Sequence, residues 1–243
     1  MRLDGRVAIV TGGGGGIGKA TCLAFAQEGA DIVIPEVNMA NAEAVSKEIV
    51  ALDRRCVVIE TNVAVGESVR AMVNKTLEEF GRIDILVNNA GIFSYTRIDA
   101  CTEAEWDKMM AVNLKGPFLC SQAVMETMKT QKFGRIINLG SLAGQVGGLV
   151  ASAPYSASKA GVMCLTKSFA RVLGEYGITV NSIAPGIAAT EMAKNHPDMT
   201  DQIPLGRVAD PTEVANVILF LASEEGQYVT GATLDVNGGI RMA

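Results

Sequence analysis

Short β-branched segments alternate with longer amphipathic segments along almost the whole chain. The apolar residues of the longer segments recur with the spacing that is typical of helices. A strand followed by a helix and a further strand is typical of right-handed crossovers, which build a parallel sheet with helices on both faces. We therefore predict an α/β fold with one doubly wound parallel sheet. The strands are expected at 7–10, 31–34, 56–59, 83–87, 135–139, 178–183 and 233–236.

The length of the chain fits one domain. Its 243 residues can bury a large core, and no repeat or linker divides them, so we predict a single domain over 1–243. Helices are expected to end at Gly29 and near Phe80, and to cover about 40–52 and about 155–174. The least regular segment, about 187–207, contains two prolines and few periodic apolar residues. Irregular segments of this length in a compact domain are typically functional, so we predict a substrate lid there.

Composition and charge argue against several classes of function. The formal net charge is −5, and an acidic surface repels the phosphates of nucleic acids. The five cysteines are scattered without a CxxC pair, which favours reduced thiols over disulfides or metal ligands. The apolar run at 7–10 is too short for a signal peptide or a membrane span. We therefore expect a cytoplasmic protein with no metal and with no nucleic-acid or membrane partner.

A run of glycines follows the first predicted strand and opens the first predicted helix. Glycine lets the backbone turn tightly and approach a pyrophosphate, and the helix N-terminus offers free N–H groups to it. A flexible turn is the alternative, but the flanking strand and helix favour a dinucleotide-binding loop. Two registers fit the run, GxGxxG at 13, 15 and 18 or GxxxGxG at 12, 16 and 18.

An acidic residue follows the second predicted strand. Glu36 lies about 20 residues after the glycine run, where dinucleotide-binding proteins place an acid that holds the adenosine ribose hydroxyls. Between Gly29 and Lys47 the sequence has no lysine or arginine, so no nearby cation would balance the 2′-phosphate of NADP. The alternative is a solvated carboxylate at a strand end. The sequence predicts NAD, rather than NADP, as the cofactor.

Tyr155 and Lys159 lie four residues apart at the start of a predicted helix, so their side chains share one helix face. A phenol with a pKa near 10 is a poor base at neutral pH, and a nearby ammonium lowers that pKa. This pair alone is a weak signal. Ser141 and the segments 88–91 and 185–190 strengthen it, because each comes just after a predicted strand, and parallel sheets bind ligands at the carboxyl ends of their strands.

Together these motifs resemble those of the short-chain dehydrogenase/reductase family, over almost the whole chain. The resemblance implies a Rossmann-like fold and hydride transfer between a nicotinamide cofactor and a secondary alcohol or its ketone. It also favours the glycine register at 12, 16 and 18. The matching segments are TGGGGGIG at 11–18, NNAG at 88–91, Asn113, Ser141, Tyr155 with Lys159, PGIAAT at 185–190, VTG at 229–231 and VNGG at 236–239.

The resemblance implies a role for each site residue. Tyr155 would protonate the ketone oxygen or deprotonate the alcohol, and Ser141 would hydrogen-bond that oxygen. Lys159 would lower the pKa of Tyr155 and bind the nicotinamide ribose, and Asn113 would hold a water that relays protons. Ser141, Gln145 and Tyr155 would contact the substrate. The cofactor would contact Gly12, Gly15, Gly16, Ile17, Gly18, Glu36, Asn62, Val63, Asn89, Ala90, Gly91, Tyr155, Lys159, Pro185, Gly186, Ile187 and Thr190.

Three positions refine this expectation. Asn62 stands where the family usually has an aspartate that accepts a hydrogen bond from adenine, and its amide oxygen can still accept one. Ser141 lies fourteen residues before Tyr155, about one more than in many relatives, which lengthens the loop between them. Gly15 stands where NADP-preferring relatives often carry a basic residue, so it also favours NAD.

Two functions of other classes are weighed against this one. A serine hydrolase is disfavoured because 140–144 lacks the GxSxG elbow, and the only histidine, His196, lies in the irregular segment. A subunit that binds NAD without catalysis is the other alternative, although Tyr155 and Lys159 are both present. The segment 142–154 carries no charge, which predicts an uncharged or apolar substrate. Arg97 either binds an anionic substrate group or is a solvated loop residue.

The chain looks most similar to the 3-oxoacyl-thioester reductases of the family, which leaves the acyl carrier open. Relatives that act on acyl carrier protein tend to present two basic residues, at positions matching Lys132 and Tyr176. One charge is therefore missing, unless Lys129 or Arg171 supplies it. With the NAD preference, this favours a 3-hydroxyacyl-CoA or similar secondary-alcohol dehydrogenase over an NADPH-dependent 3-oxoacyl-acyl-carrier-protein reductase.

The resemblance further implies a homotetramer, assembled through the helix that carries Tyr155 and the helix before it. Four apolar residues of that helix either belong to this interface or pack in the core of the chain, and the sequence does not decide between the two. These residues are Val162, Leu165, Phe169 and Leu173.

Overall fold

The computed structural model describes residues 1–148, 150–195 and 197–242, which form one domain around a seven-stranded sheet. The strands are parallel and lie in the order β3-β2-β1-β4-β5-β6-β7. The predicted doubly wound parallel sheet is therefore confirmed. The strands are β1 Val7–Val10, β2 Asp31–Glu36, β3 Cys56–Glu60, β4 Ile85–Asn88, β5 Gly134–Leu139, β6 Ile178–Pro185 and β7 Thr233–Val236.

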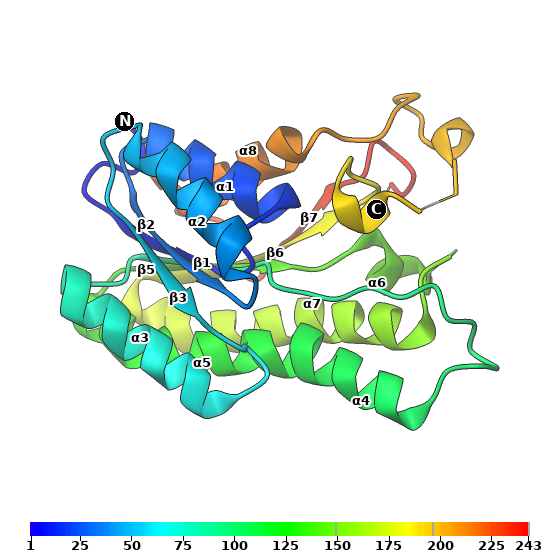
Figure 1. Ribbon diagram of the computed structural model, residues 1–243, viewed down its shortest axis with the longest axis horizontal. Coiled ribbons are helices and arrows are strands. Elements are labelled where there is room, and N and C mark those ends of the chain that lie inside the picture. Colours follow the sequence, from blue (N-terminus) through cyan, green and yellow to red (C-terminus); the bar gives the residue numbers. More distant parts are fainter. Residues whose placement is uncertain (149, 196, 243) are drawn as a thin grey trace.

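Helices cover both faces of the sheet (Figure 1). α1, α2 and α8 lie on one face, and α3, α5 and α7 lie on the other, with α4 continuing that second layer. This double cover buries every residue of the central strands β1, β4, β5 and β6. The helices are α1 Gly16–Gln27, α2 Met39–Val50, α3 Gly66–Phe80, α4 Glu103–Met110, α5 Gly116–Gln131, α6 Leu142–Val146, α7 Ala153–Leu173 and α8 Pro211–Ala222.

The direction in which strands are added reverses between β1 and β4. The chain first places β2 and β3 on one side of β1, and then places β4 to β7 on its other side. The connections that follow β1 and β4 therefore diverge and open a crevice at the carboxyl ends of the strands. The predicted motifs follow β1, β4, β5 and β6, so the fold brings them to this one edge of the sheet.

Two strands, β2 and β6, are longer than predicted by two residues, and β3 and β5 are longer by one. β2 continues through Pro35 and Glu36, because these residues stay in register with Ile59 and Glu60 of β3. β6 continues to Pro185, which is in register with β7. The longer β2 brings Glu36 to the carboxyl edge of the sheet, beside the glycine loop.

One predicted strand begins later than expected. β4 starts at Ile85 rather than at residue 83. The residue before it, Asp84, is buried, and its carboxylate accepts hydrogen bonds from the Val7 amide at 2.9 Å and from Arg82 Nε at 2.8 Å. The predicted helices at 40–52 and 155–174 correspond to α2 and α7, with ends shifted by one or two residues.

The apolar residues of α7 pack mainly inside the chain. Val162 and Leu173 are fully buried, and Phe169 is 8% exposed. Phe169 and Leu173 belong to the core between α7 and the sheet. Leu165 is partly buried against the same core. These residues therefore pack mainly in the core of the chain, and the homotetramer stays a prediction.

Other sequence expectations concern membranes, metals and thiols. Within the described residues, no helix has the length and apolar content that a membrane crossing requires. The same residues contain no cluster of histidine, cysteine or acidic side chains that could hold a metal ion. All five cysteines are free thiols.

A buried chain of amide and hydroxyl groups joins the sheet to α5 and α7. The Asn88 side-chain amide of β4 donates to Ser121 of α5 at 3.0 Å and to Asn138 of β5 at 2.7 Å. The Asn138 amide donates to the Thr166 hydroxyl of α7 at 2.9 Å. Because all four side chains are buried, each bond compensates for the loss of water. This chain fixes the helix that carries Tyr155 and Lys159 against the sheet.

We expect Asn138→Leu to destabilise the protein by about 1–3 kcal/mol, because it leaves a buried N–H of Asn88 without its acceptor. Urea unfolding measures the change. The control is Thr179→Val, because the buried Thr179 hydroxyl has no hydrogen-bond partner among the described residues, and we expect a change below about 0.5 kcal/mol. Equal changes for the two variants would contradict this account of the buried chain.

Candidate active site

A cavity of about 600 Å³ opens at the carboxyl edge of the sheet, and most of the predicted site residues line it. Three predicted residues, Gly18, Asn113 and Gln145, lie outside its wall. The predicted residues in the wall are Gly12, Gly15, Gly16, Ile17, Glu36, Asn62, Val63, Asn89, Ala90, Gly91, Ser141, Tyr155, Lys159, Pro185, Gly186, Ile187 and Thr190.

The glycine loop lies in contact with the segment after β4. Gly12 has a φ of +67°, and a Cβ there would lie 2.9 Å from the Ala90 Cα, so only glycine permits this approach. A Cβ at Gly18 would collide with the carbonyl oxygen of Gly12. Gly18 therefore lets α1 pack against the loop and does not itself face the cavity. Gly15, in contrast, faces open space.

Thr11 and Asn89 fasten the two segments together. The Thr11 hydroxyl accepts hydrogen bonds from the backbone N–H groups of Asn89 and Ala90, both at 3.0 Å. The Asn89 side chain donates to the carbonyl oxygens of Thr11 and Gly12, both at 2.9 Å. The floor of the cavity is thus a rigid junction between the ends of β1 and β4.

The Glu36 carboxylate is held at one end of the cavity. It accepts hydrogen bonds from the backbone N–H groups of Gly14 at 3.3 Å, Val37 at 2.9 Å and Asn38 at 3.3 Å. Such bonds fix the position of the carboxylate. A negative charge therefore faces whatever lies over the glycine loop.

The Asn62 side chain forms part of the wall near Glu36. Its amide oxygen accepts a hydrogen bond from the Ala64 backbone N–H at 3.0 Å. An amide oxygen has two lone pairs, so it retains capacity for one more donor, as the sequence leads us to expect. Val63 lines the cavity beside it.

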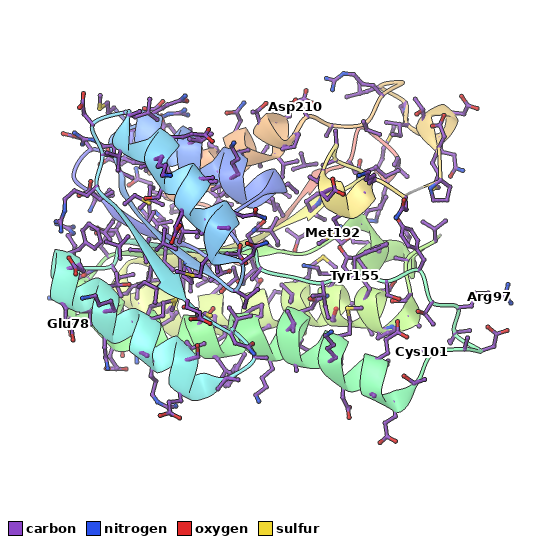
Figure 2. The ribbon with its side chains drawn as sticks, viewed as in Figure 1. Glu78, Arg97, Cys101, Tyr155, Met192 and Asp210 are labelled. Atoms are coloured by element: carbon purple, nitrogen blue, oxygen red, sulfur yellow. The ribbon has the colours of Figure 1, made fainter. Side chains whose placement is uncertain are left out.

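Ser141 and Tyr155 meet at the other end of the cavity. Ser141 follows β5 and caps α6, where its hydroxyl accepts the Ala143 N–H at 3.1 Å. Tyr155 lies on the first turn of α7, and Figure 2 shows it below the turn that carries Met192. A hydrogen bond joins the Tyr155 and Ser141 side chains. The two hydroxyls can therefore contact one oxygen atom of a ligand.

Burial governs the charge of the tyrosine and the lysine. It raises the pKa of Tyr155, and the hydrogen bond with Ser141 opposes that rise only in part. It also lowers the pKa of Lys159 from 10.5 to about 8. Burial is the largest influence on the phenol in this structure, and the lowering of its pKa by Lys159 stays a prediction. The Lys159 ammonium donates to the Leu139 carbonyl oxygen at 2.6 Å.

Asn113 lies behind the cavity in a π-helical turn, Ala111–Lys115. Its side chain accepts a hydrogen bond from the Ile92 N–H at 2.8 Å and donates to the Ile92 carbonyl at 2.9 Å. A Cβ at Gly91 would lie 3.3 Å from Asn113 Oδ1 and 3.7 Å from Lys159 Nζ. Only the small residue Gly91 therefore separates Asn113 from the lysine. π-Helical turns occur often at functional sites.

Gln145 is engaged elsewhere. Its Nε2 donates to the Asp235 carboxylate at 2.6 Å, and that carboxylate also accepts Arg241 Nη1 at 2.9 Å. The short helix α6 turns Gln145 toward the end of β7 and away from the cavity. The structure therefore does not bring Gln145 to the site with Ser141 and Tyr155.

Further residues line the cavity that the sequence analysis did not single out, and among them are two aromatic and three large apolar side chains. Phe93 and Tyr95 come directly after the NNAG segment, so proximity to that motif could have indicated them. Met192, Met199 and Ile240 also line it. They come from irregular segments, and only the folded chain reveals their position.

The segment at 187–207 contains two short 3-10 turns, Glu191–Ala193 and Thr200–Gln202. It forms one wall of the cavity, and its action as a lid stays a prediction. His196 lies outside the described residues. Arg97 is 84% exposed, is paired with Asp99 at 3.2 Å and points away from the body of the protein in Figure 2, as a solvated loop residue does.

Comparison with known proteins agrees with this arrangement. The family model described as enoyl-(acyl carrier protein) reductase matches residues 12–241. A 3-oxoacyl-[acyl-carrier-protein] reductase of Thermotoga maritima is 41% identical over 99% of both chains. The crystal structure of a short-chain type dehydrogenase/reductase from Mycobacterium marinum has a TM-score of 0.95 at 33% identity and covers 99% of this chain and 97% of its own.

The chain belongs to the short-chain dehydrogenase/reductase family. As a member of that family it is an oxidoreductase of the ketone–alcohol class. Its relatives in the family differ in their substrates. The (2S)-[(R)-hydroxy(phenyl)methyl]succinyl-CoA dehydrogenase subunit BbsD of Thauera aromatica is 41% identical over 98% of both chains.

The buried lysine of this family member should lower its stability. Because the pKa of Lys159 falls from 10.5 to about 8 on folding, the unfolded chain binds more protons between these pH values. Stability therefore rises with pH in that window, and below pH 8 the cost is about 3 kcal/mol. We expect Lys159→Met to stabilise the unliganded protein by about 1–3 kcal/mol at pH 7, because the lost hydrogen bond to the Leu139 carbonyl offsets part of the gain.

Urea unfolding at pH 7 and pH 10 measures this effect, and we expect the advantage of Lys159→Met to shrink at the higher pH. Lys167→Met is the control, since Lys167 is exposed on the same helix and its loss should change stability by less than about 0.5 kcal/mol. A destabilised Lys159→Met protein at pH 7 would refute the assigned cost of burial.

Proposed function

We propose that this protein is an NAD(H)-dependent dehydrogenase/reductase that interconverts a secondary alcohol and a ketone on an apolar acyl thioester of coenzyme A. One observation carries the proposal. Ser141, Tyr155 and Lys159 lie in the wall of the same cavity as the glycine loop and Glu36. A dinucleotide over the loop and a substrate oxygen at Tyr155 would therefore share one enclosed space.

The residues of the cavity fit a dinucleotide. Gly15 leaves open space at the N-terminus of α1, where backbone N–H groups favour a pyrophosphate. Glu36 would accept hydrogen bonds from the adenosine ribose, and Asn62 from adenine. The backbone of 185–187 and the Thr190 hydroxyl would hold the carboxamide. When bound, the nicotinamide supplies or accepts the hydride.

The chain's own residues would handle the proton. Tyr155 would donate its hydroxyl proton to the ketone oxygen during reduction and take the proton back during oxidation. The Ser141 hydroxyl would hydrogen-bond the same oxygen and stabilise its developing charge. The Lys159 ammonium would stabilise the phenolate and hold the ribose. Asn113, which only Gly91 separates from Lys159, would position a water that relays a proton back to Tyr155.

The charges of the cavity favour NAD over NADP. Among the described residues that line it, Lys159 is the only basic one, and it lies beside Tyr155 at the opposite end from Glu36. A 2′-phosphate at about 5 Å from the Glu36 carboxylate would meet a repulsion of about 3 kcal/mol per unit charge at an effective dielectric of about 20. Solvent and salt reduce this value.

We therefore expect kcat/KM for NAD(H) to exceed that for NADP(H) by about ten- to a hundredfold. Initial rates with both cofactors measure the ratio. Glu36→Gln should lower this ratio, because it removes the negative charge that repels the 2′-phosphate. Glu60→Gln is the control, because Glu60 ends the neighbouring strand in register with Glu36 but does not line the cavity. Equal efficiency with both cofactors would rule out this part of the proposal.

Two observations bear on the acyl carrier. The name of the Thauera aromatica relative gives a coenzyme A thioester as its substrate, whereas the name of the Thermotoga maritima relative gives a substrate on acyl carrier protein. At the surface, Lys132 is exposed at the end of α5, and the Tyr176 ring lies 5.2 Å from Lys129 Nζ. Glu126 neutralises that lysine at 2.9 Å. Lys129 therefore offers an acidic carrier protein little free charge, which favours coenzyme A, while the exposed Arg171 stays the alternative source of a second cation.

We expect a 3-oxoacyl group to be reduced at least as efficiently on coenzyme A as on acyl carrier protein at low salt. Tyr176→Arg should raise kcat/KM with the carrier protein only, because added positive charge speeds the docking of an acidic protein. Arg171→Lys, which keeps the charge, is the control. A clear advantage for the carrier protein in the unmodified enzyme, fading as salt rises, would instead favour the NADPH-dependent biosynthetic reductase.

A homotetramer and a cytoplasmic location complete the proposal. The exposed aromatic side chains Phe118 of α5 and Trp106 of α4, with Val172 of α7, lie on the helices of one layer. The Phe118 ring lies 6.1 Å from Phe169, so an apolar surface joins α5 to α7 and could be covered by a second copy. Light scattering that gave the mass of one chain, 25.5 kDa, would exclude the tetramer.

A further inference from the structure

Three aromatic rings lie in a row at the substrate end of the cavity. The Phe93 ring packs edge to face against the Tyr155 ring on one side and the Tyr95 ring on the other, with both pairs of ring centroids 4.7 Å apart. All three residues line the cavity. Phe93 and Tyr95, here called the aromatic wall, therefore extend the surface of the catalytic candidate Tyr155.

Hydrogen bonds hold the aromatic wall in place. Ser94, between its two members, accepts the Ser152 N–H at 2.9 Å through its carbonyl oxygen. The Ser94 hydroxyl donates to the Glu105 carboxylate of α4 at 2.6 Å and accepts the Thr96 N–H at 3.0 Å. The loop is thus tied to α4 and to the residue that precedes α7. Because the aromatic wall is already fixed, it binds a ligand without the entropic cost of ordering its own loop.

Adaptable side chains stand across the cavity from the aromatic wall. Met192 and Met199 line it from the segment 187–207, and Figure 2 shows Met192 on the turn that faces α7 and Tyr155. Methionine fits its shape to its neighbour, and its sulfur makes favourable contacts with aromatic rings. A flat ring would therefore meet an aromatic edge or face on one side and thioether groups on the other.

Charge makes this end of the cavity unsuitable for a free carboxylate. Apart from Lys159, the described residues of the cavity wall include no basic side chain. Glu191, at the rim, is acidic and pairs with Lys194 at 3.2 Å. A neutral, flat and apolar group suits this surface better than a charged or strongly polar one.

We propose that the aromatic wall selects substrates with an aryl group on the reacting carbon, that is, aryl ketones and the corresponding benzylic alcohols. This inference rests on the proposed function, because it places the reacting oxygen at the Tyr155 hydroxyl. Phe93 contacts the ring of Tyr155, so a substituent on the reacting carbon lies within reach of Phe93. The thioester arm then leaves toward the mouth of the cavity.

The test compares two coenzyme A thioesters that differ only in one ring, 3-oxo-3-phenylpropanoyl and 3-cyclohexyl-3-oxopropanoyl. Their kcat/KM values with NADH are measured for the unmodified enzyme and for Phe93→Leu. We expect Phe93→Leu to reduce the phenyl value about three- to tenfold more than the cyclohexyl value, the size of an aromatic pair contact. The factor by which the substitution lowers kcat/KM is compared between the two thioesters, so the different intrinsic reactivity of the two ketones cancels.

Tyr95→Leu gives a second, independent variant, and we expect a smaller loss in the same direction because Tyr95 is 37% exposed. Phe220→Leu is the control, since Phe220 lies on α8 outside the cavity, and both values should stay unchanged. If Phe93→Leu and Tyr95→Leu each lowered kcat/KM by the same factor for both thioesters, the aryl preference would be overturned and the proposed function would still stand. No reduction of either thioester by the unmodified enzyme would instead count against the proposed function itself, and the aryl preference would fall with it.

Discussion

The site depends on the contact between the ends of β1 and β4. At this point the order of the strands reverses, and the chain must bring two connections together before they diverge. Gly12 makes the contact possible, because a Cβ would lie 2.9 Å from Ala90. Thr11 and Asn89 then close it with four hydrogen bonds of 2.9–3.0 Å. A larger residue at Gly12 would separate the glycine loop from the segment that backs Lys159.

The rest of the site is arranged around this junction. On one side, β2 carries Glu36 toward the glycine loop, where a backbone N–H of that loop binds its carboxylate. On the other side, β5 and α7 carry Ser141, Tyr155 and Lys159. The buried amide chain from Asn88 through Asn138 to Thr166 keeps α7 in register with the sheet. The two halves of the proposed reaction, cofactor and proton transfer, thus share one rigid support.

Burial has opposite consequences for stability and for the proposed chemistry. It lowers the pKa of Lys159 to about 8 and raises that of Tyr155, so both charged forms are disfavoured in the unliganded protein. The pKa of about 8 places Lys159 close to its charge transition at working pH, as acid–base chemistry requires, whereas the raised pKa of Tyr155 keeps the phenol protonated as a proton donor. The lysine therefore lowers the stability of the fold in exchange for a group that can change its charge, as is common at functional sites.

Much of this arrangement follows from sequence patterns. The order and type of the strands, and the motifs at their carboxyl ends, could be predicted because buried strands have a short and strongly apolar signature and because parallel strands end at one edge. The end of β2 could not, since the pairing of Pro35 and Glu36 depends on residues of β3 that lie far away in the sequence. Gln145 was misplaced because the turn of a five-residue helix decides where it points. Met192, Met199 and Ile240 have no local signal, because irregular chain carries them to the cavity.

In the proposed reaction Tyr155 transfers the proton, in a site that binds the cofactor independently of that hydroxyl. The most direct measurement compares the unmodified enzyme with Tyr155→Phe, using NADH binding by fluorescence and turnover of a 3-oxoacyl-CoA. The account predicts an almost unchanged dissociation constant for NADH and a fall in kcat of about 10²–10⁴-fold, as loss of a general acid causes. Retention of more than about a tenth of the activity would contradict the account.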